Sequence, residues 1–186
     1  KTNCYGVKIE GGKKISEIVL YLTDRGINVM GHIGLSPQSI KNYKNIKIKG
    51  FNISEEKKLI EDACELYEAG VFSIVIEAVA ESAAKAVVKR IKKYKNKFIP
   101  IIGIGASNEC NGQILVTDDI LGITNKYKKI KPPKFVKVYK NHDPETSIKI
   151  FCKEVRSGIF PSSEFCYIKT KKNSNNITYL KFNEKK

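Results

Sequence analysis

Apolar and polar positions alternate along the chain with two different periods, and the period changes at turn residues. Short apolar runs, such as residues 72–76, are typical of strands covered on both faces of a parallel sheet. Longer segments repeat their apolar residues every three or four positions, which is the spacing of an amphipathic helix. The pattern predicts strands over residues 4–10, 27–31, 72–76, 98–104 and 113–116. It predicts helices over residues 13–25, 54–69, 80–95 and 144–157.

The second of these helices has the clearest boundaries. Ser54 is the expected N-cap, Glu55 and Glu56 occupy the first turn where the helix dipole favours acidic side chains, and Gly70 ends the helix. Because strands and helices alternate throughout, the sequence predicts an α/β fold built on a parallel sheet. Residues 1–167 are expected to form one domain, and the polar Lys- and Asn-rich tail, 168–186, is expected to be disordered, although its short run 177–180 could pair with another strand.

The formal charge of +15 raises the question of a nucleic-acid partner. The 34 Lys and Arg residues are spread along the chain, and neither an arginine cluster nor a basic motif interleaved with aromatics is present. We therefore expect no nucleic-acid function, while an anionic small substrate would benefit from the positive field. Binding through charge remains the alternative, and it predicts steeply salt-dependent retention on heparin or DNA.

Cysteine use and hydropathy indicate the cellular setting. The five cysteines are widely spaced and include no C-x-x-C pair, which argues against a disulfide framework or a zinc site and favours reduced thiols. No run approaches the roughly 20 apolar residues of a membrane span, and no secretory signal is visible. The expectation is a cytoplasmic globular protein without a membrane partner.

Lys8 and Glu10 are the first candidates for chemistry. They lie two residues apart on a predicted strand, so their side chains point to the same side, and Gly11 follows them directly. A lysine and a carboxylate at the carboxyl end of a parallel strand are costly to bury unless they are paired or bind a ligand. The alternative is an ion pair between the two side chains.

His32 and Glu77 are the other candidates, because each follows an apolar run at a predicted strand end. Desolvation of Glu77 beside residues 72–76 would disfavour its ionised form, which is one way to obtain a base that works near neutral pH. The alternatives are a histidine that only satisfies a neighbour and a glutamate that is merely solvated.

Several segments, taken together, resemble the ketopantoate hydroxymethyltransferase family. The matching segments span roughly residues 3–167 in order and spacing, and they are VKIEGG (7–12), GHIGLSPQS (31–39), IE (76–77), IGIGA (102–106), NGQILV (111–116), PKF (133–135) and EVRSGIFP (154–161). This resemblance implies a (β/α)8 TIM-barrel fold, of which the chain would hold about the last five βα units. The missing leading strands and the first residue, Lys1, indicate a fragment of a longer polypeptide.

The resemblance also implies a reaction, which is hydroxymethyl transfer from 5,10-methylenetetrahydrofolate to 3-methyl-2-oxobutanoate. By this analogy Glu10 binds magnesium, Lys8 contacts the keto acid, Glu77 is the proton acceptor, and His32 supports substrate binding. The family further implies a homo-oligomer, commonly a decamer. The alternatives are a non-catalytic remnant and another magnesium-dependent barrel enzyme acting on 2-oxo acids.

Four positions depart from the family pattern. They are Phe51 in place of a common arginine, Ser107 in place of a glycine, Asn111 in place of an aspartate and Phe165 in place of a histidine. These departures bring the contacts with the substrate loop and the folate into question more than the central chemistry.

Overall fold

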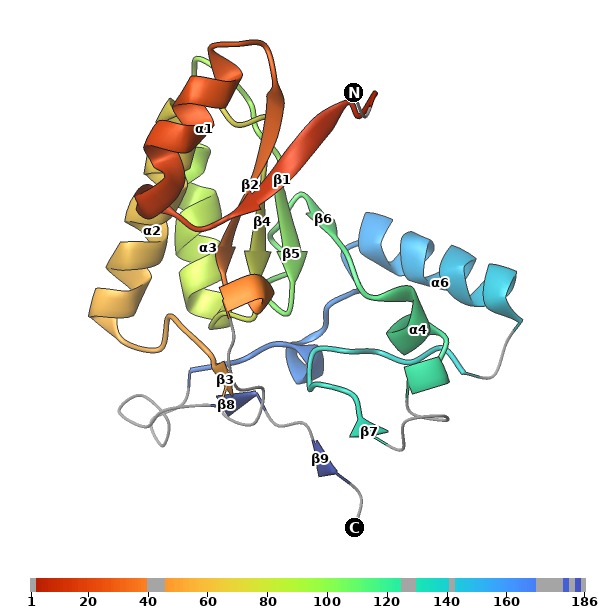
Figure 1. Cartoon of the computed structure of the whole chain (residues 1–186). Helices are drawn as coiled ribbons and strands as arrows, with labels where there is room; N and C mark the ends of the chain where they lie inside the picture. Colours follow the sequence, from red (N-terminus) through yellow and green to blue (C-terminus); the bar gives the residue numbers. More distant parts are fainter. Residues whose placement is uncertain are drawn as a thin grey trace.

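A five-stranded sheet forms the centre of the computed structural model, which describes residues 3–39, 46–124, 130–140, 143–169, 179–180 and 183–184. Its strand order is β1-β2-β4-β5-β6, and every pairing is parallel (Figure 1). The strands are β1 (Gly6–Glu10), β2 (Asn28–Gly34), β4 (Ser73–Glu77), β5 (Ile101–Ile104) and β6 (Gly112–Gln113). The predicted α/β fold with a parallel sheet is therefore confirmed.

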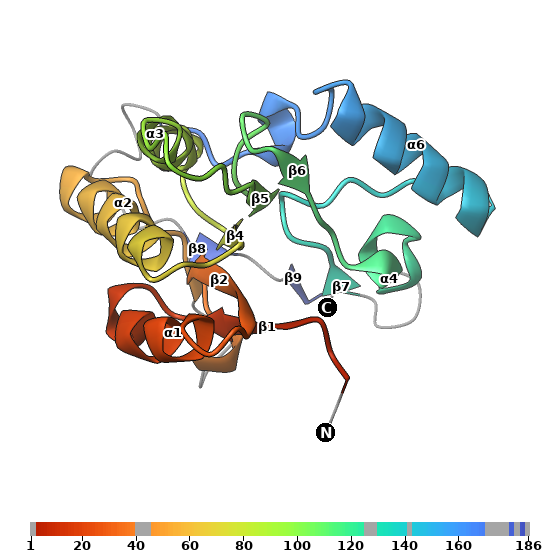
Figure 2. The same ribbon diagram turned by 90° about the horizontal axis from the view of Figure 1, so that it is seen from above.

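Three helices connect the first four of these strands and cover one face of the sheet, as the two views in Figures 1 and 2 show. They are α1 (Ser16–Thr23), which follows the 3₁₀ turn η1 (Lys13–Ile15), α2 (Ile53–Glu68) and α3 (Glu81–Ile91). Neighbouring strands thus follow chain order with helices on one side, which is the winding of a (β/α) barrel. In the described residues the sheet is open, and β1 pairs only with β2. None of the described helices combines the length and apolar character that a membrane span needs.

A second, smaller layer lies beyond β6 (Figure 2). It contains α4 (Thr117–Ile120) and α6 (Pro144–Arg156), which share an apolar cluster of Ile120, Tyr139, Phe151 and Phe160. Asp143 caps α6 by accepting a hydrogen bond from the N–H of Thr146. The predicted helix over 144–157 is therefore confirmed to within one residue.

Short elements gather near the carboxyl ends of the strands. They are η2 (Pro37–Ser39), β3 (Ile46–Lys47), β7 (Ile130–Lys131), η4 (Ser163–Phe165), β8 (Tyr179–Leu180) and β9 (Asn183–Glu184). β8 pairs antiparallel with β3, and β9 pairs antiparallel with β7. The rest of the tail predicted to be disordered, 170–178, 181–182 and 185–186, lies outside the described residues.

Several predicted boundaries were wrong in ways that have a physical reason. The N-cap of α2 is Asn52, whose side chain accepts from the N–H of Glu55, so Ser54 lies inside the helix. β2 runs on to Gly34, which puts His32 within the strand, because β4 pairs with it through that residue. The strand expected over 113–116 is only Gly112–Gln113, since Val116 already caps α4.

Helix packing decides which side chains face the open side of the sheet. Gly31 lies under α2, where an added Cβ would come within 2.7 Å of Leu66 Cδ1. Val29 and Ile33, two residues to either side, share that helix-covered face and are buried. The alternate residues of β2, including His32, therefore point away from the helices.

Candidate active site

Strand register brings the four predicted site residues to the face of the sheet opposite the helices. Glu10 is the partner of His32, and Gly34 is the partner of Glu77. Since residues two apart on a strand share a face, Lys8 and Glu10 on β1, His32 on β2 and Glu77 on β4 all project to the same side. Glu10, His32 and Glu77 lie in the carboxyl-terminal halves of their strands, and Lys8 is the central residue of β1. The carboxyl ends of these strands point toward the bottom of Figure 1.

His32 lies between the two glutamates. Its Nδ1 is 3.5 Å from Glu10 Oε1, and its Nε2 is 3.1 Å from Glu77 Oε2. The imidazole is only 1% exposed, and neither ring nitrogen has an aligned hydrogen-bond partner among the described residues. A buried imidazole in this state has unused hydrogen-bonding capacity, which is unusual in a structure that satisfies most buried polar groups.

Glu10 has a second contact that the sequence pattern did not reveal. The backbone N–H of Gln38, in η2, donates to Glu10 Oε2 over 3.1 Å. This contact bends the segment after β2 back toward β1 and helps to hold the carboxylate, whose side chain is 8% exposed. Sequence spacing carries no signal for it, because 28 positions separate the two residues.

Lys8 lies on the same side of the sheet but is exposed to solvent. Its ammonium makes no ion pair with any residue that the structure describes, so the alternative of a Lys8–Glu10 ion pair is not observed there. A cation without a partner remains available to an anionic ligand at this face.

The backbone around Glu77 is tightly constrained. Its carbonyl accepts a hydrogen bond from the N–H of Leu35 at 2.8 Å. Gly34 has a φ of +90°, and a Cβ added there would lie 2.3 Å from the Glu77 carbonyl oxygen. Ala78 has a φ of +48°, a conformation that non-glycine residues rarely adopt. Backbone strain of this kind is frequent at functional sites, where surrounding contacts hold it in place.

Lys49 is a further cation near this end of the sheet that the sequence analysis did not single out. Its ammonium donates to the carbonyl of Gly34 at 2.8 Å. The segment around it runs beside the turn after β4, because the N–H of Ala80 donates to the Lys49 carbonyl at 2.8 Å. Lys49 thus helps to fix the β2 end against the turn that follows Glu77.

A magnesium site would be incomplete with the described residues alone. Glu10 offers the oxygen ligand that Mg²⁺ prefers, but this ion requires about six oxygen ligands in near-octahedral geometry. No group of three or more His, Cys, Asp or Glu residues able to hold a metal occurs in the described part of the chain. Glu10 therefore fits as one ligand of a magnesium ion, and the other ligands have to come from elsewhere.

The four departures from the family pattern have structural roles here. Asn111 Oδ1 accepts a hydrogen bond from the N–H of Ile101, and buried Ser107 accepts one from the N–H of Glu109. Phe51 is buried in the main core, and the Phe165 ring packs 5.8 Å from that of Phe160. Each of these side chains stabilises the fold near the ends of the strands.

The arrangement is suited to moving a proton at an anionic substrate. Glu77 can accept a proton, since a positioned glutamate is one of the side chains that act as general bases. Lys8 supplies positive charge on the same face, and Glu10 offers oxygen ligands on the other side of His32. These groups converge from β1, β2 and β4.

Comparisons of the sequence with known proteins identify relatives of this chain. The profile of a family described as ketopantoate hydroxymethyltransferase matches residues 1–163. A 3-methyl-2-oxobutanoate hydroxymethyltransferase of Chlorobaculum tepidum is 42% identical over 166 residues, which are 88% of this chain and 56% of that protein. A protein of the same name from Paracoccus denitrificans is 38% identical over 169 residues, which are 90% of this chain and 58% of that protein.

The chain thus spans between one half and two thirds of the length of these relatives. The match with the family profile covers most of the chain, including every strand that carries a candidate site residue. On this evidence the chain belongs to the ketopantoate hydroxymethyltransferase family.

Proposed function

We propose that this chain provides the proton-transfer part of an active site that hydroxymethylates 3-methyl-2-oxobutanoate. The one-carbon unit would come from 5,10-methylenetetrahydrofolate, and with one water the products would be 2-dehydropantoate and tetrahydrofolate. The observation that carries the proposal is the placement of Glu10 and Glu77 on opposite sides of buried His32. The names of the two relatives support the reaction class.

Each site residue has a part in this proposal. Lys8 attracts the carboxylate of the keto acid, because its ammonium has no competing ion pair in the described residues. Glu77 removes the proton from C3, and the resulting enolate bonds to the one-carbon unit. Both C–N bonds that hold this carbon to the folate break, and the water supplies the oxygen of the new hydroxyl group. His32 is the proposed supporting partner of Glu77, since its Nε2 lies 3.1 Å from Oε2 and is not used by another hydrogen bond among the described residues. The buried position of His32 limits competition from water at this contact.

Magnesium belongs to the proposal as a cofactor of which Glu10 is one ligand. When bound, it would withdraw charge from the keto and carboxylate oxygens and so stabilise the enolate. Substrate oxygens and residues beyond this chain would complete its coordination, because no group of three or more His, Cys, Asp or Glu residues able to hold a metal occurs among the described residues.

The open edge of the sheet at β1 supports the proposal that a further strand and helix are needed to complete the fold. β1 has no second partner among the described residues, although an unpaired strand edge readily binds another strand. Beside it, α1 exposes Ile18, Leu20 and Tyr21, which are 56%, 46% and 57% exposed. We infer that a βα unit corresponding to the unmatched part of the relatives docks here.

The homo-oligomer that the family resemblance implies remains a prediction.

The test supplies the missing part in trans. The chain is co-expressed with the part of the Chlorobaculum tepidum relative that it does not match. Exchange of the C3 proton of 3-methyl-2-oxobutanoate into D₂O is followed by NMR with magnesium. We expect exchange only when both parts are present, and Glu77→Gln should slow it by roughly 10²- to 10⁴-fold.

The matched control is Glu145→Gln, which removes the same charge from an exposed position on α6. It should leave exchange unchanged. Exchange that survives Glu77→Gln would remove Glu77 from the role of base. A folded complex without any exchange would favour the non-catalytic alternative, and turnover without the folate would favour different 2-oxo-acid chemistry.

A further inference from the structure

The outer side of α3 carries two adjoining hollows that the proposed reaction does not use. The first lies between the end of α3 and the amino end of β5, with a cavity volume of about 160 Å³. The second runs along α3 and has a volume of about 450 Å³. Val88 and Lys92 line both, so the two form one continuous surface feature, here called the α3 hollow.

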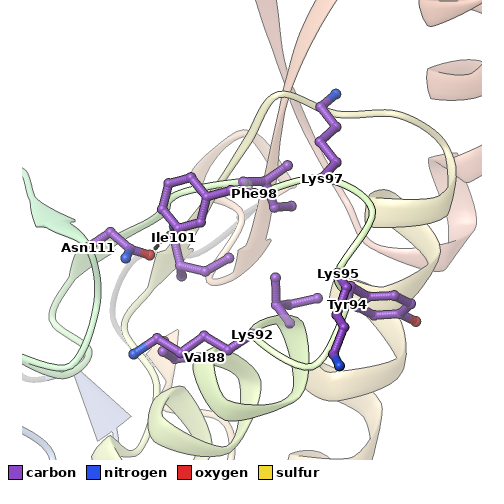
Figure 3. Close-up of a pocket in the computed structure, with 10 residues that line it drawn as sticks. Val88, Lys92, Tyr94, Lys95, Lys97, Phe98, Ile101 and Asn111 are labelled. Carbon is purple, nitrogen blue, oxygen red and sulfur yellow. Dashed lines mark hydrogen bonds between the residues drawn. The ribbon is translucent and has the colours of Figure 1, made fainter.

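The first part of the α3 hollow has an apolar floor and a rim that carries both aromatic rings and the lysines Lys92, Lys95 and Lys97. Its floor consists of buried aliphatic side chains, namely Val88, Ile91, Ile99 and Ile101. Phe98 lies at its rim and is 73% exposed, so its ring is accessible to a ligand in the hollow. Figure 3 shows this ring on the same side of the hollow as Asn111. This part offers an apolar floor and the face of the Phe98 ring for contact, within a partly basic rim.

An amide group lies beside that surface. Asn111 Oδ1 is occupied by the N–H of Ile101, at 2.9 Å. The Nδ2 of Asn111 is therefore left to donate a hydrogen bond, because no described residue accepts one from it. A ring with acceptor nitrogen or oxygen atoms would satisfy this donor while stacking on Phe98.

The second part of the α3 hollow is strongly basic. Lys85 is balanced by Glu81 at 2.9 Å and by Glu109 at 3.7 Å. Lys89 and Lys92, on the following turns, make no ion pair within the described part of the chain and line the hollow. The lining also includes the carboxylate of Glu109, which would direct an anion toward the two lysines without acidic partners.

We propose that the α3 hollow binds a small molecule in which a flat heteroaromatic ring is joined to a phosphate chain, the class of nucleoside di- and triphosphates. The ring stacks on Phe98 over the aliphatic floor and accepts from Asn111, and the phosphates lie along Lys92 and Lys89. The apolar surface suits the ring and the adjoining lysines suit the phosphates, so one ligand can occupy both parts of the hollow. The hollow lies on the helix-covered side of the sheet, away from His32.

Binding is tested on the whole chain with a fluorescent analogue of adenosine triphosphate, followed by anisotropy at near-physiological salt. The doubly substituted variant Lys89→Gln/Lys92→Gln should weaken binding about fivefold or more, because two phosphate contacts are lost. Phe98→Ala should weaken it about tenfold through lost stacking. Competition with unlabelled adenosine and with inorganic tripolyphosphate separates the contributions of ring and phosphate.

The matched control is Lys93→Gln/Lys153→Gln, which removes the same charge from exposed positions outside the hollow. It should bind like the unchanged protein. The proposal would be overturned by an equal loss of binding in this control. It would also be overturned if either tripolyphosphate or adenosine competed as well as unlabelled adenosine triphosphate does. Absence of binding at millimolar analogue would also overturn the proposal. Weaker binding of the analogue in the hollow variants, with unchanged binding in the control, supports it.

Discussion

At the scale of single residues, the site depends on backbone positions as much as on its ionisable side chains. Gly34 lets the end of β2 cross directly over the Glu77 carbonyl, and the hydrogen bond from Leu35 N–H to that carbonyl joins the two strand ends. This close approach requires both a positive φ and the absence of a Cβ. The position of Glu77 relative to His32 therefore depends on a residue without a functional group.

Gly34→Ala is accordingly expected to destabilise the protein by about 3 kcal/mol, since it adds a steric clash to an unfavourable φ. Urea unfolding followed by circular dichroism measures the free energy of unfolding. The control is Gly158→Ala, whose φ is +70° but whose added Cβ meets no atom within 4 Å. It should cost only about 1 kcal/mol, and equal losses in the two variants would contradict the close approach at Glu77.

At the scale of elements, α2 begins with a compact polar network that joins it to the preceding segment. Asn52 caps the helix, and Glu55 in the first turn accepts from the N–H of Gly50 at 2.9 Å and pairs with Lys47. Partial burial opposes ionisation of Glu55, but the hydrogen bonds from Lys47 and Gly50 outweigh it and lower its pKa. The network fixes where α2 starts and so how it covers β2.

The corrected cap can be tested by comparing two neighbouring substitutions. Asn52→Ala should lower the free energy of unfolding by about 1 kcal/mol, because the N–H of Glu55 loses its acceptor. Ser54→Ala should change it by less than about 0.5 kcal/mol, since Ser54 is an exposed residue inside the first turn. A larger loss for Ser54→Ala in thermal or urea unfolding would restore Ser54 as the cap.

At the scale of the whole molecule, the core keeps two thiols in their neutral form. Burial raises the pKa of both Cys110 and Cys166 from 9.0 to about 11. These residues lie on different segments of the chain, one near the start of β6 and the other after η4. Unfolding exposes both thiols to water, so the stability of the whole fold is linked to their ionisation.

The sign of this linkage follows from the raised folded-state pKa. Between pH 9 and pH 11 the unfolded chain loses thiol protons that the folded chain retains, so the free energy of unfolding falls as pH rises. The slope should approach at most about 1.4 kcal/mol per pH unit for each thiol. Urea unfolding between pH 8 and pH 11 measures it.

The doubly substituted variant Cys110→Ala/Cys166→Ala separates the thiols from tyrosines that act in the same direction. Burial also raises the pKa of Tyr167, and this contribution is unchanged in the variant. A shallower decline above pH 9 in the variant is expected. An identical decline in both proteins would exclude the thiols as its cause.

Much of the architecture could be read from local patterns. The alternation of strand-sized runs and helical spacing predicted the parallel sheet, and the helices over 80–95 and 144–157 correspond to α3 and α6. The largest errors lay at boundaries. α3 ends at Ile91 and not at residue 95, β5 begins at Ile101 and not at residue 98, and β2 runs further and β6 less far than predicted. Strand ends depend on partners in neighbouring strands, which local patterns do not contain.

The candidate site, too, could be predicted where it depends on local patterns and not where it depends on distant contacts. The two-residue spacing of Lys8 and Glu10 and the place of Glu77 at the end of an apolar run singled out these side chains, because strand periodicity is a local property. The roles assigned to them remain predictions. Contacts of Glu10 with His32 and with the N–H of Gln38 were not foreseen, since they depend on strand register and on the path of the segment after β2.

Residue types, their period along each strand and the family to which they correspond could all be read from the amino-acid order. The placement of His32 between Glu10 and Glu77 and the hollow outside α3 emerge only when the chain is folded. The difference lies in the range of the interactions. Periodicity and capping arise from residues a few positions apart, whereas register and cavities arise when helix packing brings distant segments together.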